Sequence, residues 1–291
     1  MPEVFEDRLN IGCWHWELSK FPAVFDKAFQ YVHEVWVPSS FAQKAIAQRS
    51  PVPVIVMPHC IEAGTATPEA RKALGLPEGG FLVLVMFDMQ SYFERKNPLG
   101  AIEAFRRAFR PEDKATLVVK VQHGASNPQA RDALQRAINA GAILVDAVLS
   151  REDTLALVGA CDVYLSLHRS EGFGLTIAEA MAMGKPVVAT AYSGNMDFMG
   201  RSNAYPVDYR SVEIERDVGP YPAGCVWADP DVEQASHLLR RIVDEPDGAR
   251  EVGRRAQEDI ARELCPRRIG TLYRERLVLH GLLSPASGEN Q

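Results

Sequence analysis

Short apolar runs of strand length alternate with helical patterns along most of the chain. These runs are nearly uninterrupted, as in FLVLVMF at 81–87, and lack the polar–apolar alternation of a strand with one face in water. Strands of this kind, each followed by a helix, are typical of parallel sheets covered on both faces. We therefore expect an α/β fold with a doubly wound parallel sheet. The expected strands lie at 10–14, 33–37, 54–57, 81–87, 116–121, 142–145, 163–167 and 186–190. Helices are expected at 41–48, 98–109, 128–140, 154–159 and 177–183.

A break in this pattern falls at 61–80, where large apolar residues are few and turn-forming residues are common. We expect a linker there, between a first block at 1–60 and a larger block at 81–265, followed by a C-terminal helix and tail at 266–291. The first block has only three expected strands, too few to bury both faces of a parallel sheet alone.

Charge and cysteine usage exclude several classes of protein. The formal net charge is −6, so a basic surface for nucleic acid is not expected. The longest wholly apolar run, 81–87, is far shorter than the ~20 residues of a membrane span, and the N-terminus shows no signal-peptide pattern. The five cysteines are scattered and form no C-x-x-C pair, which favours reduced thiols in a cytoplasmic protein and argues against zinc.

The stretch HRSEGFGLTIAEAMAMGKPVVAT, which begins at His168, carries the clearest chemical signal. It follows a buried strand, and its two glycines allow a close approach of the backbone to a ligand. The spacing of Thr176 and Glu179 matches a capping box, so the next helix is predicted to begin at Thr176. The first N–H groups of such a helix are unpaired and favour an anion. The pattern predicts a phosphate site, although it is neither G-x-G-x-x-G nor a P-loop.

Two carboxylates accompany these glycines. Glu171 lies in the loop and Glu179 lies eight residues later. Both can border one ligand that has a phosphate at the helix end, a sugar on one side and a nucleoside on the other, because carboxylates accept hydrogen bonds from hydroxyl pairs. The alternative for Glu179 is a capping role alone.

These residues resemble a known family. SEGFGLTIAEAMAMGKPVVAT is similar to the E-x7-E signature of retaining glycosyltransferases with the GT-B fold, family 4 (group 1). CDVYLSLHRSEGFG resembles the strand that leads into this signature, and FDMQSYFERKNPLGAIEAFRRAF resembles a turn followed by a basic pair. SGNMDFM and CVWADPD resemble segments of members that assemble polysaccharides. The likeness covers 81–275 well and 10–58 loosely.

The resemblance implies roles for individual residues. Glu171 would bond hydroxyls of the donor sugar, and Glu179 would accept from the ribose hydroxyls. Arg95 and Lys96 would neutralise the departing diphosphate. The family's Gly-Arg pattern after the first strand is replaced here by FDMQS, which leaves open whether Arg95 takes the place of that arginine. The remaining donor-binding candidates are the backbone of Phe173, Gly174 and Leu175, together with Thr176, Ser91 and His168.

The remaining assignments concern single residues, and the first of them depends on the same resemblance. His15, at the end of a strand in NIGCWHWE, would face the donor sugar. His168 has the alternative of bonding a neighbouring carbonyl, and Trp14 and Trp16 are expected to pack rather than to hold an acceptor. Asp229-Pro-Asp231 matches the D-x-D metal motif, but Asp231 precedes a helical pattern as an N-cap, so no metal or other cofactor is expected.

The sequence and the resemblance together indicate a retaining glycosyltransferase that uses a nucleotide diphosphate sugar and a glycan or lipid-linked acceptor. The family has two Rossmann-like domains, of which only the end of the first is expected here, as in an N-terminally truncated enzyme, and the last helix would cross back to the first block. The alternatives are a nucleotide-sugar-binding module that needs a partner subunit, and a GT-B-type epimerase. A peripheral position at the inner membrane face and an oligomeric association, for example through the exposed edge of the first sheet, stay open.

Overall fold

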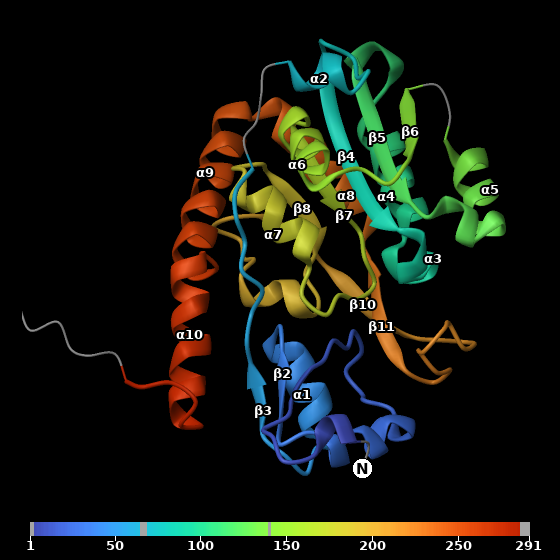
Figure 1. Cartoon of the computed structure of the whole chain (residues 1–291). Coiled ribbons are helices and arrows are strands. Elements are labelled where there is room, and N and C mark those ends of the chain that lie inside the picture. The colour runs from blue at the N-terminus through green and yellow to red at the C-terminus, as the bar shows by residue number, and fades with distance from the viewer. Residues whose placement is uncertain (1–2, 65–68, 139–140, 286–291) are drawn as a thin grey trace, which may run out of the picture.

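The computed structural model describes residues 3–64, 69–138 and 141–285. Its largest element is a parallel sheet of six strands in the order β6-β5-β4-β7-β8-β9 (Figure 1). The chain order reverses between β4 and β7, which is the switch point where doubly wound sheets bind ligands. The expected α/β fold with a doubly wound parallel sheet is therefore confirmed. We call this element the large sheet; its strands are β4 (Phe81–Asp88), β5 (Ala115–Gln122), β6 (Ala142–Asp146), β7 (Val163–Ser166), β8 (Val187–Thr190) and β9 (Tyr205–Val207).

Helices cover both faces of the large sheet, which explains its uninterrupted apolar strands. Along β4, Leu82, Leu84 and Met86 point to one core, and Val83 and Val85 point to the other. Helices α6 (Arg151–Ala160), α7 (Leu175–Ala182) and α9 (Pro246–Glu263) close the first face. Helices α4 (Pro98–Ala108), α5 (Pro128–Ala137) and α8 (Val232–Asp244) close the second.

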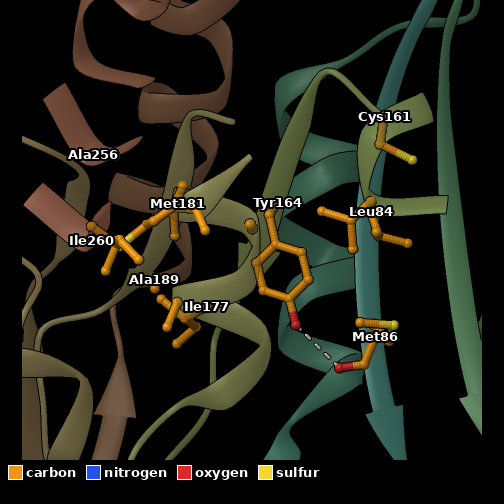
Figure 2. Close-up of a cluster of buried hydrophobic side chains, with 14 of the residues drawn as sticks. Leu84, Met86, Cys161, Tyr164, Ile177, Met181, Ala189, Ala256 and Ile260 are labelled. Atoms are coloured by element: carbon orange, nitrogen blue, oxygen red, sulfur yellow. Dashed lines mark hydrogen bonds between the residues drawn. The ribbon is translucent and has the colours of Figure 1, made fainter. Parts of the chain in front are cut away.

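The first of these cores positions the start of α7. Figure 2 shows Tyr164 of β7 between the strand residues Leu84 and Met86 and the helix residues Ile177 and Met181. The buried Tyr164 hydroxyl lies 3.4 Å from the carbonyl oxygen of Met86, drawn as a dashed line. It also lies 2.6 Å from the hydroxyl of Thr176. The aromatic ring thus fixes the first turn of α7 against the centre of the sheet.

A second parallel sheet, the small sheet, has three strands in the order β1 (Ile11–Cys13), β2 (Glu34–Val37) and β3 (Val54–Val56). Its core contains Val35 and Val37 of β2 and side chains of α1 (Ser40–Ala47), but also Ile214, Tyr221 and Trp227. The last three come from a later hairpin of β10 (Tyr209–Glu213) and β11 (Val226–Pro230) and from its connection. As expected for three strands, the small sheet does not complete its core alone.

Helix α10 (Pro266–Leu279) covers the opposite face of β2 (Figure 1). Tyr273 packs edge-on against Trp36, with ring centroids 4.9 Å apart. Arg276 Nε donates to Glu34 Oε2 at 2.9 Å, and Glu34 is only 1% exposed. Burial would raise the pKa of Glu34, but the hydrogen bonds from Arg276 and from the Trp36 indole lower it to about 2. A charged pair therefore fastens the end of the described chain to the small sheet.

Several expectations on local structure need correction. Strands β9, β10 and β11 were not predicted, because none of them is a clear apolar run: β9 has only three residues, β10 is mostly exposed, and β11 contains Asp229 and Pro230. Helix α6 begins at Arg151 rather than at 154, because Ser150 caps it by accepting from the N–H of Asp153. The helix expected at 128–140 ends at Ala137, because Ile138 has an extended backbone; residues 139–140 lie outside the described ranges. The N-cap predicted at Asp231 is confirmed, since its carboxylate accepts from the N–H of Gln234.

The remaining elements are short: α2 (Ala70–Ala73), α3 (Phe93–Lys96) and 3-10 helices at Glu3–Phe5, Ala23–Tyr31, Met89–Ser91, Pro111–Asp113, Gly124–Ser126 and Gly194–Asp197. Among the described helices, none has the length and apolar character needed to cross a membrane.

Candidate functional site

Helix α3 brings two basic side chains to Glu171. Lys96 Nζ lies 2.5 Å from Glu171 Oε1, and Arg95 Nη1 lies 3.2 Å from Oε2. Arg95 is 4% exposed and is oriented by two carbonyls, since it donates to Ser170 O at 2.8 Å and to Ser91 O at 3.2 Å. Four of the predicted site residues, Ser91, Arg95, Lys96 and Glu171, therefore gather in one place.

The backbone around α3 is unusual at both ends. Tyr92 before it has φ 64° and Asn97 after it has φ 49°, so two residues other than glycine adopt positive φ. Asparagine tolerates this region, but a tyrosine there costs on the order of 1–3 kcal/mol. Asn97 Nδ2 donates to the carbonyl of Leu167 at 2.9 Å, which ties this turn to the end of β7. The geometry holds Arg95 and Lys96 at the switch point of the large sheet.

Charge decides the protonation state of Glu171. Its side chain is 13% exposed. Burial would raise the pKa of this carboxyl, but the positive charges of Lys96 and Arg95 lower it to about 2. Burial also lowers the pKa of Lys96, against the opposing effect of Glu171. Glu171 is thus a carboxylate at neutral pH and can accept from hydroxyl groups, but it has no proton to give.

The loop at 170–174, which we call the glycine loop, ends at the N-terminus of α7. The helix begins at Leu175, and its N-cap is Gly174 with φ 92° and no side-chain cap. The predicted capping box of Thr176 and Glu179 is therefore wrong: Thr176 lies inside the first turn, and its hydroxyl contacts Tyr164. Because no side chain caps this end, its first N–H groups face the glycine loop without an intrahelical partner. Phe173 is buried and Leu175 is 45% exposed.

Glu179 is not brought to the Glu171 cluster. It lies farther along α7, is 2% exposed, and forms a salt bridge with Arg151 at the start of α6. Arg151 was missed from the sequence, because a basic residue in a first helical turn carries no specific signal. Its guanidinium is the more exposed partner, at 57%. The pair stands where the loop before α6 meets α7.

The structure places His168 behind the site rather than on its surface. Its side chain is buried, with Nδ1 3.0 Å from Ser166 Oγ and Nε2 3.1 Å from Asn195 Oδ1 and 3.2 Å from the carbonyl of Tyr192. Burial lowers the pKa of this imidazole. Both ring nitrogens already have partners within the protein, so neither remains for a sugar-nucleotide donor. The alternative expected for His168, a hydrogen bond to a neighbouring carbonyl, is the one that the structure shows.

His15 approaches the glycine loop through a second histidine. His15 follows β1 and His59 follows β3, so the two rings meet at the carboxyl edge of the small sheet. Their Nε2 atoms are 2.9 Å apart, and His59 packs edge-on against Phe173 with centroids 5.0 Å apart. Burial, and then the charge of His15, lower the pKa of His59. His59 was missed, although its place after an expected strand, like that of His15, was a usable signal.

Hydrogen bonds join the small sheet to the glycine loop. Ser39, the N-cap of α1, accepts from the N–H of Ala42 and donates to the carbonyl of Gly172 at 2.6 Å. The hydroxyl of Ser170 donates to the carbonyl of Glu17. Ser40 N donates to Asp197 Oδ2 at 2.6 Å, which adds a bond to the segment that follows β8. These partners are far apart in sequence and were not predicted.

The carboxylates of the D-x-D sequence have structural partners. Asp229 pairs with Arg169 at 2.9 Å and with Arg210 at 2.8 Å, and Asp231 caps α8. Within the ranges that the structure describes, no cluster of three or more histidine, cysteine and acidic residues could hold a metal ion.

Comparisons with known proteins agree with this geometry. The model of the family described as glycosyl transferases group 1 matches residues 66–259. A curated relative, the alpha-monoglucosyldiacylglycerol synthase of Streptococcus pneumoniae (strain ATCC BAA-255 / R6), is 30% identical over 124 residues, which are 42% of this chain and only 26% of that protein.

Solved structures share the fold. Anabaena HepE in complex with UDP-glucose has a TM-score of 0.74 at 17% identity, over 94% of this chain and 72% of that one. Sucrose-phosphate synthase from Thermosynechococcus elongatus has a TM-score of 0.66 at 21% identity, over 88% and 61% of the two chains. The large sheet, the glycine loop that ends at α7 and the family match over most of the chain lead to one conclusion: this protein belongs to the family of group 1 glycosyl transferases and has the GT-B fold.

Proposed function

We propose that this chain transfers a sugar from a nucleotide diphosphate donor to a glycan or lipid-linked acceptor, with retention at the anomeric carbon. The observation that carries the proposal is the ionised Glu171 between Lys96 and Arg95, beside the uncapped N-terminus of α7. Anions bind at such helix ends, and the basic pair adds two positive charges for a diphosphate.

Each part of the donor then has a partner. The diphosphate lies against the first N–H groups of α7 and the side chains of Lys96 and Arg95, and a hydroxyl of the sugar donates to Glu171. The ribose hydroxyls donate to Glu179, which requires Arg151 to share or release that carboxylate. His15 faces the sugar from the small sheet.

The reaction breaks the bond between the anomeric carbon and the diphosphate oxygen, and the electron pair stays on the diphosphate. Lys96 and Arg95 stabilise the charge that develops there. The acceptor oxygen forms its bond on the same face, and its proton passes to the leaving phosphate oxygen. Glu171 has no proton and is already paired with two cations, so the two glutamates are not the acid–base pair of a glycosidase.

Similar proteins support the substrate classes. Anabaena HepE forms a complex with UDP-glucose, and the streptococcal relative is named as a synthase of a monoglucosyldiacylglycerol. The chain spans about a quarter of that relative's length, so a lipid acceptor is one candidate here and a glycan is the other.

We also propose a division of labour along the chain. Residues 81–265 bind the donor, 1–60 form the acceptor side, 61–80 link the two, and the helix within 266–291 crosses back to the first part. The bond between Arg276 and Glu34 supports this last assignment.

The first test is a thermal-shift screen with UDP-, GDP-, dTDP- and ADP-sugars. We expect stabilisation by donors of one base. If none of them raises the melting temperature, the donor site is wrong. Stabilisation without transfer to any acceptor favours a binding module that needs a partner subunit, and interconversion of the free nucleotide sugar favours an epimerase.

The second test separates the ribose role of Glu179 from a structural one. Glu179→Ala should weaken binding of the nucleotide by about 10- to 100-fold, because hydrogen bonds to a charged group are lost. The control is Glu152→Ala, an exposed glutamate on the neighbouring helix. If calorimetry gives equal nucleotide affinities for both variants, Glu179 serves only to hold Arg151.

A further inference from the structure

A cavity of about 530 Å³ opens between the small sheet and the loop that precedes β11. This volume falls in the range of small-molecule sites. Its walls include the aromatic residues Trp14, Phe25, Tyr92 and Tyr221, and two hydrogen-bonding residues, His15 and Glu17. None of the donor-binding candidates of α7 lines this cavity, whereas His15 does, so the cavity adjoins the donor site without overlapping its helix end.

The lining has the chemistry of a carbohydrate site. Aromatic faces carry partial negative charge, and the C–H groups on one face of a sugar ring carry partial positive charge, so the two stack. A few polar groups then fix the hydroxyls. Tyr221 donates to Glu17 Oε2 at 2.9 Å, whereas Glu17 Oε1 and His15 Nδ1 have no hydrogen-bond partner among the described residues. Both atoms are free to bond hydroxyl groups.

The cavity shares its walls with the transfer site. Glu17 lies against the glycine loop, since a Cβ placed on Gly172 would come within 3.7 Å of its Cγ. His15 reaches the loop through His59 and Phe173. Tyr92 leads directly into the helix of Arg95 and Lys96, and its ring packs on Tyr221 with centroids 5.3 Å apart. A molecule in the cavity is therefore held beside the reacting groups.

We propose that this cavity binds a sugar ring of the acceptor, stacked on the aromatic residues, with its hydroxyls bonded to Glu17 and His15. The proposal deepens the proposed function and rests on it. According to this proposal, the cavity binds a glycosyl unit of the acceptor rather than an acyl chain. It also gives Trp14, expected from the sequence only to pack, a contact with substrate.

The test uses Phe25, which is 38% exposed at the cavity, and its neighbour Val24, which is 77% exposed and does not line it. Phe25→Leu keeps an apolar side chain but removes the ring face, and Val24→Ala is the matched control. The probes are methyl glycosides at millimolar concentration, because an aryl group would itself enter an aromatic cavity. Dioctanoylglycerol is the lipid probe.

Methyl glycosides should change the tryptophan fluorescence of the chain, since Trp14 and Trp16 both line the cavity. Phe25→Leu should weaken this binding and raise the acceptor KM by about tenfold, with kcat and donor affinity unchanged, and Val24→Ala should change neither. The proposal is overturned if both variants behave alike, or if dioctanoylglycerol binds and the methyl glycosides do not. Fluorescence with glycosides needs no donor, so failure here is distinct from failure of the donor screen.

Discussion

The two parallel sheets of this protein reach stability by different routes. The large sheet has six strands, and helices from its own part of the chain cover both of its faces. The small sheet has three strands and takes Ile214, Tyr221 and Trp227 on one face and helix α10 on the other. A sheet of three strands buries too little surface alone, so its cover must come from distant segments. The candidate site therefore lies where the large-sheet part of the chain, which has a complete core of its own, contacts the small sheet, which has not.

The largest effect is expected from a substitution that removes the support of the small sheet by helix α10. Arg276→Gln leaves the buried carboxylate of Glu34 without its permanently charged partner and with only the Trp36 indole and His280 beside it, which should lower the free energy of unfolding by about 3–5 kcal/mol. Urea denaturation measures the loss. The control is Arg268→Gln, an exposed residue on the same helix. Equal stability of the two variants would mean that α10 does not support the small sheet.

A second experiment asks which unit carries the charge stabilisation of transfer. Lys96→Met removes a cation from the large-sheet side and should lower kcat by about 10²- to 10³-fold. His15→Ala acts from the small sheet and should cost only about tenfold, since its ring reaches the glycine loop through His59. Steady-state kinetics with a donor identified in the thermal-shift screen would measure kcat for both variants. A larger loss for His15→Ala would reverse the assignment.

Acid should weaken both units in one pH range. The pKa values of Glu34 and Glu171 are each lowered from 4.5 to about 2. Between these values the unfolded chain binds more protons than the folded one, so stability rises with pH. The contribution of each carboxylate, about 3 kcal/mol at about 1.4 kcal/mol per pKa unit, is complete above pH 4.5 and is lost as the pH falls toward 2.

Glu34→Gln and Glu171→Gln should each make the stability less dependent on pH in that range, as measured by urea denaturation at several pH values. The exposed Glu152→Gln serves as the reference. If all three variants keep the slope of the parent protein, neither buried carboxylate drives acid unfolding.

The smallest expected effect concerns the junction of the two units. Ser39→Ala removes the cap of α1 and the bond to the carbonyl of Gly172. Loss of such a cap costs about 1 kcal/mol. Ser40→Ala removes only a bond to Asp197 and is the comparison variant. A shift in donor affinity with Ser39→Ala alone would show that the small sheet holds the glycine loop in its binding shape.

The sequence predicted the large sheet well because local patterns specify it. Each of its five expected strands is an apolar run that is preceded or followed in the sequence by a helical pattern. The hydrophobic periodicity and the length of the runs are enough to identify them. Strand β9 was missed because it has only three residues. Strand β10 was missed because its residues are mostly exposed, and its pairing with β11 depends on the partner rather than on a local pattern.

For the site, residue types were easier to predict than their partners. Glu171, Arg95 and Lys96 were singled out from the sequence, and the structure brings them together. The capping box failed because the N-cap is Gly174, two residues before Thr176, which places Thr176 inside the first turn. Arg151 and Ser39 act through contacts with residues distant in the chain, which no local spacing encodes, whereas the place of His59 after an expected strand could have indicated it.

The ion pair between Glu34 and Arg276 affects the order in which the parts of the chain can fold during synthesis. Domains generally fold as they leave the ribosome, N-terminal part first. Here the strand that carries Glu34 is made early, yet its charge has no counter-ion until α10 has been synthesised, 242 residues later. The small sheet, although synthesised first, is therefore among the last parts of the chain to reach its final packing. A chain that ends before Arg276 would keep Glu34 without this counter-ion.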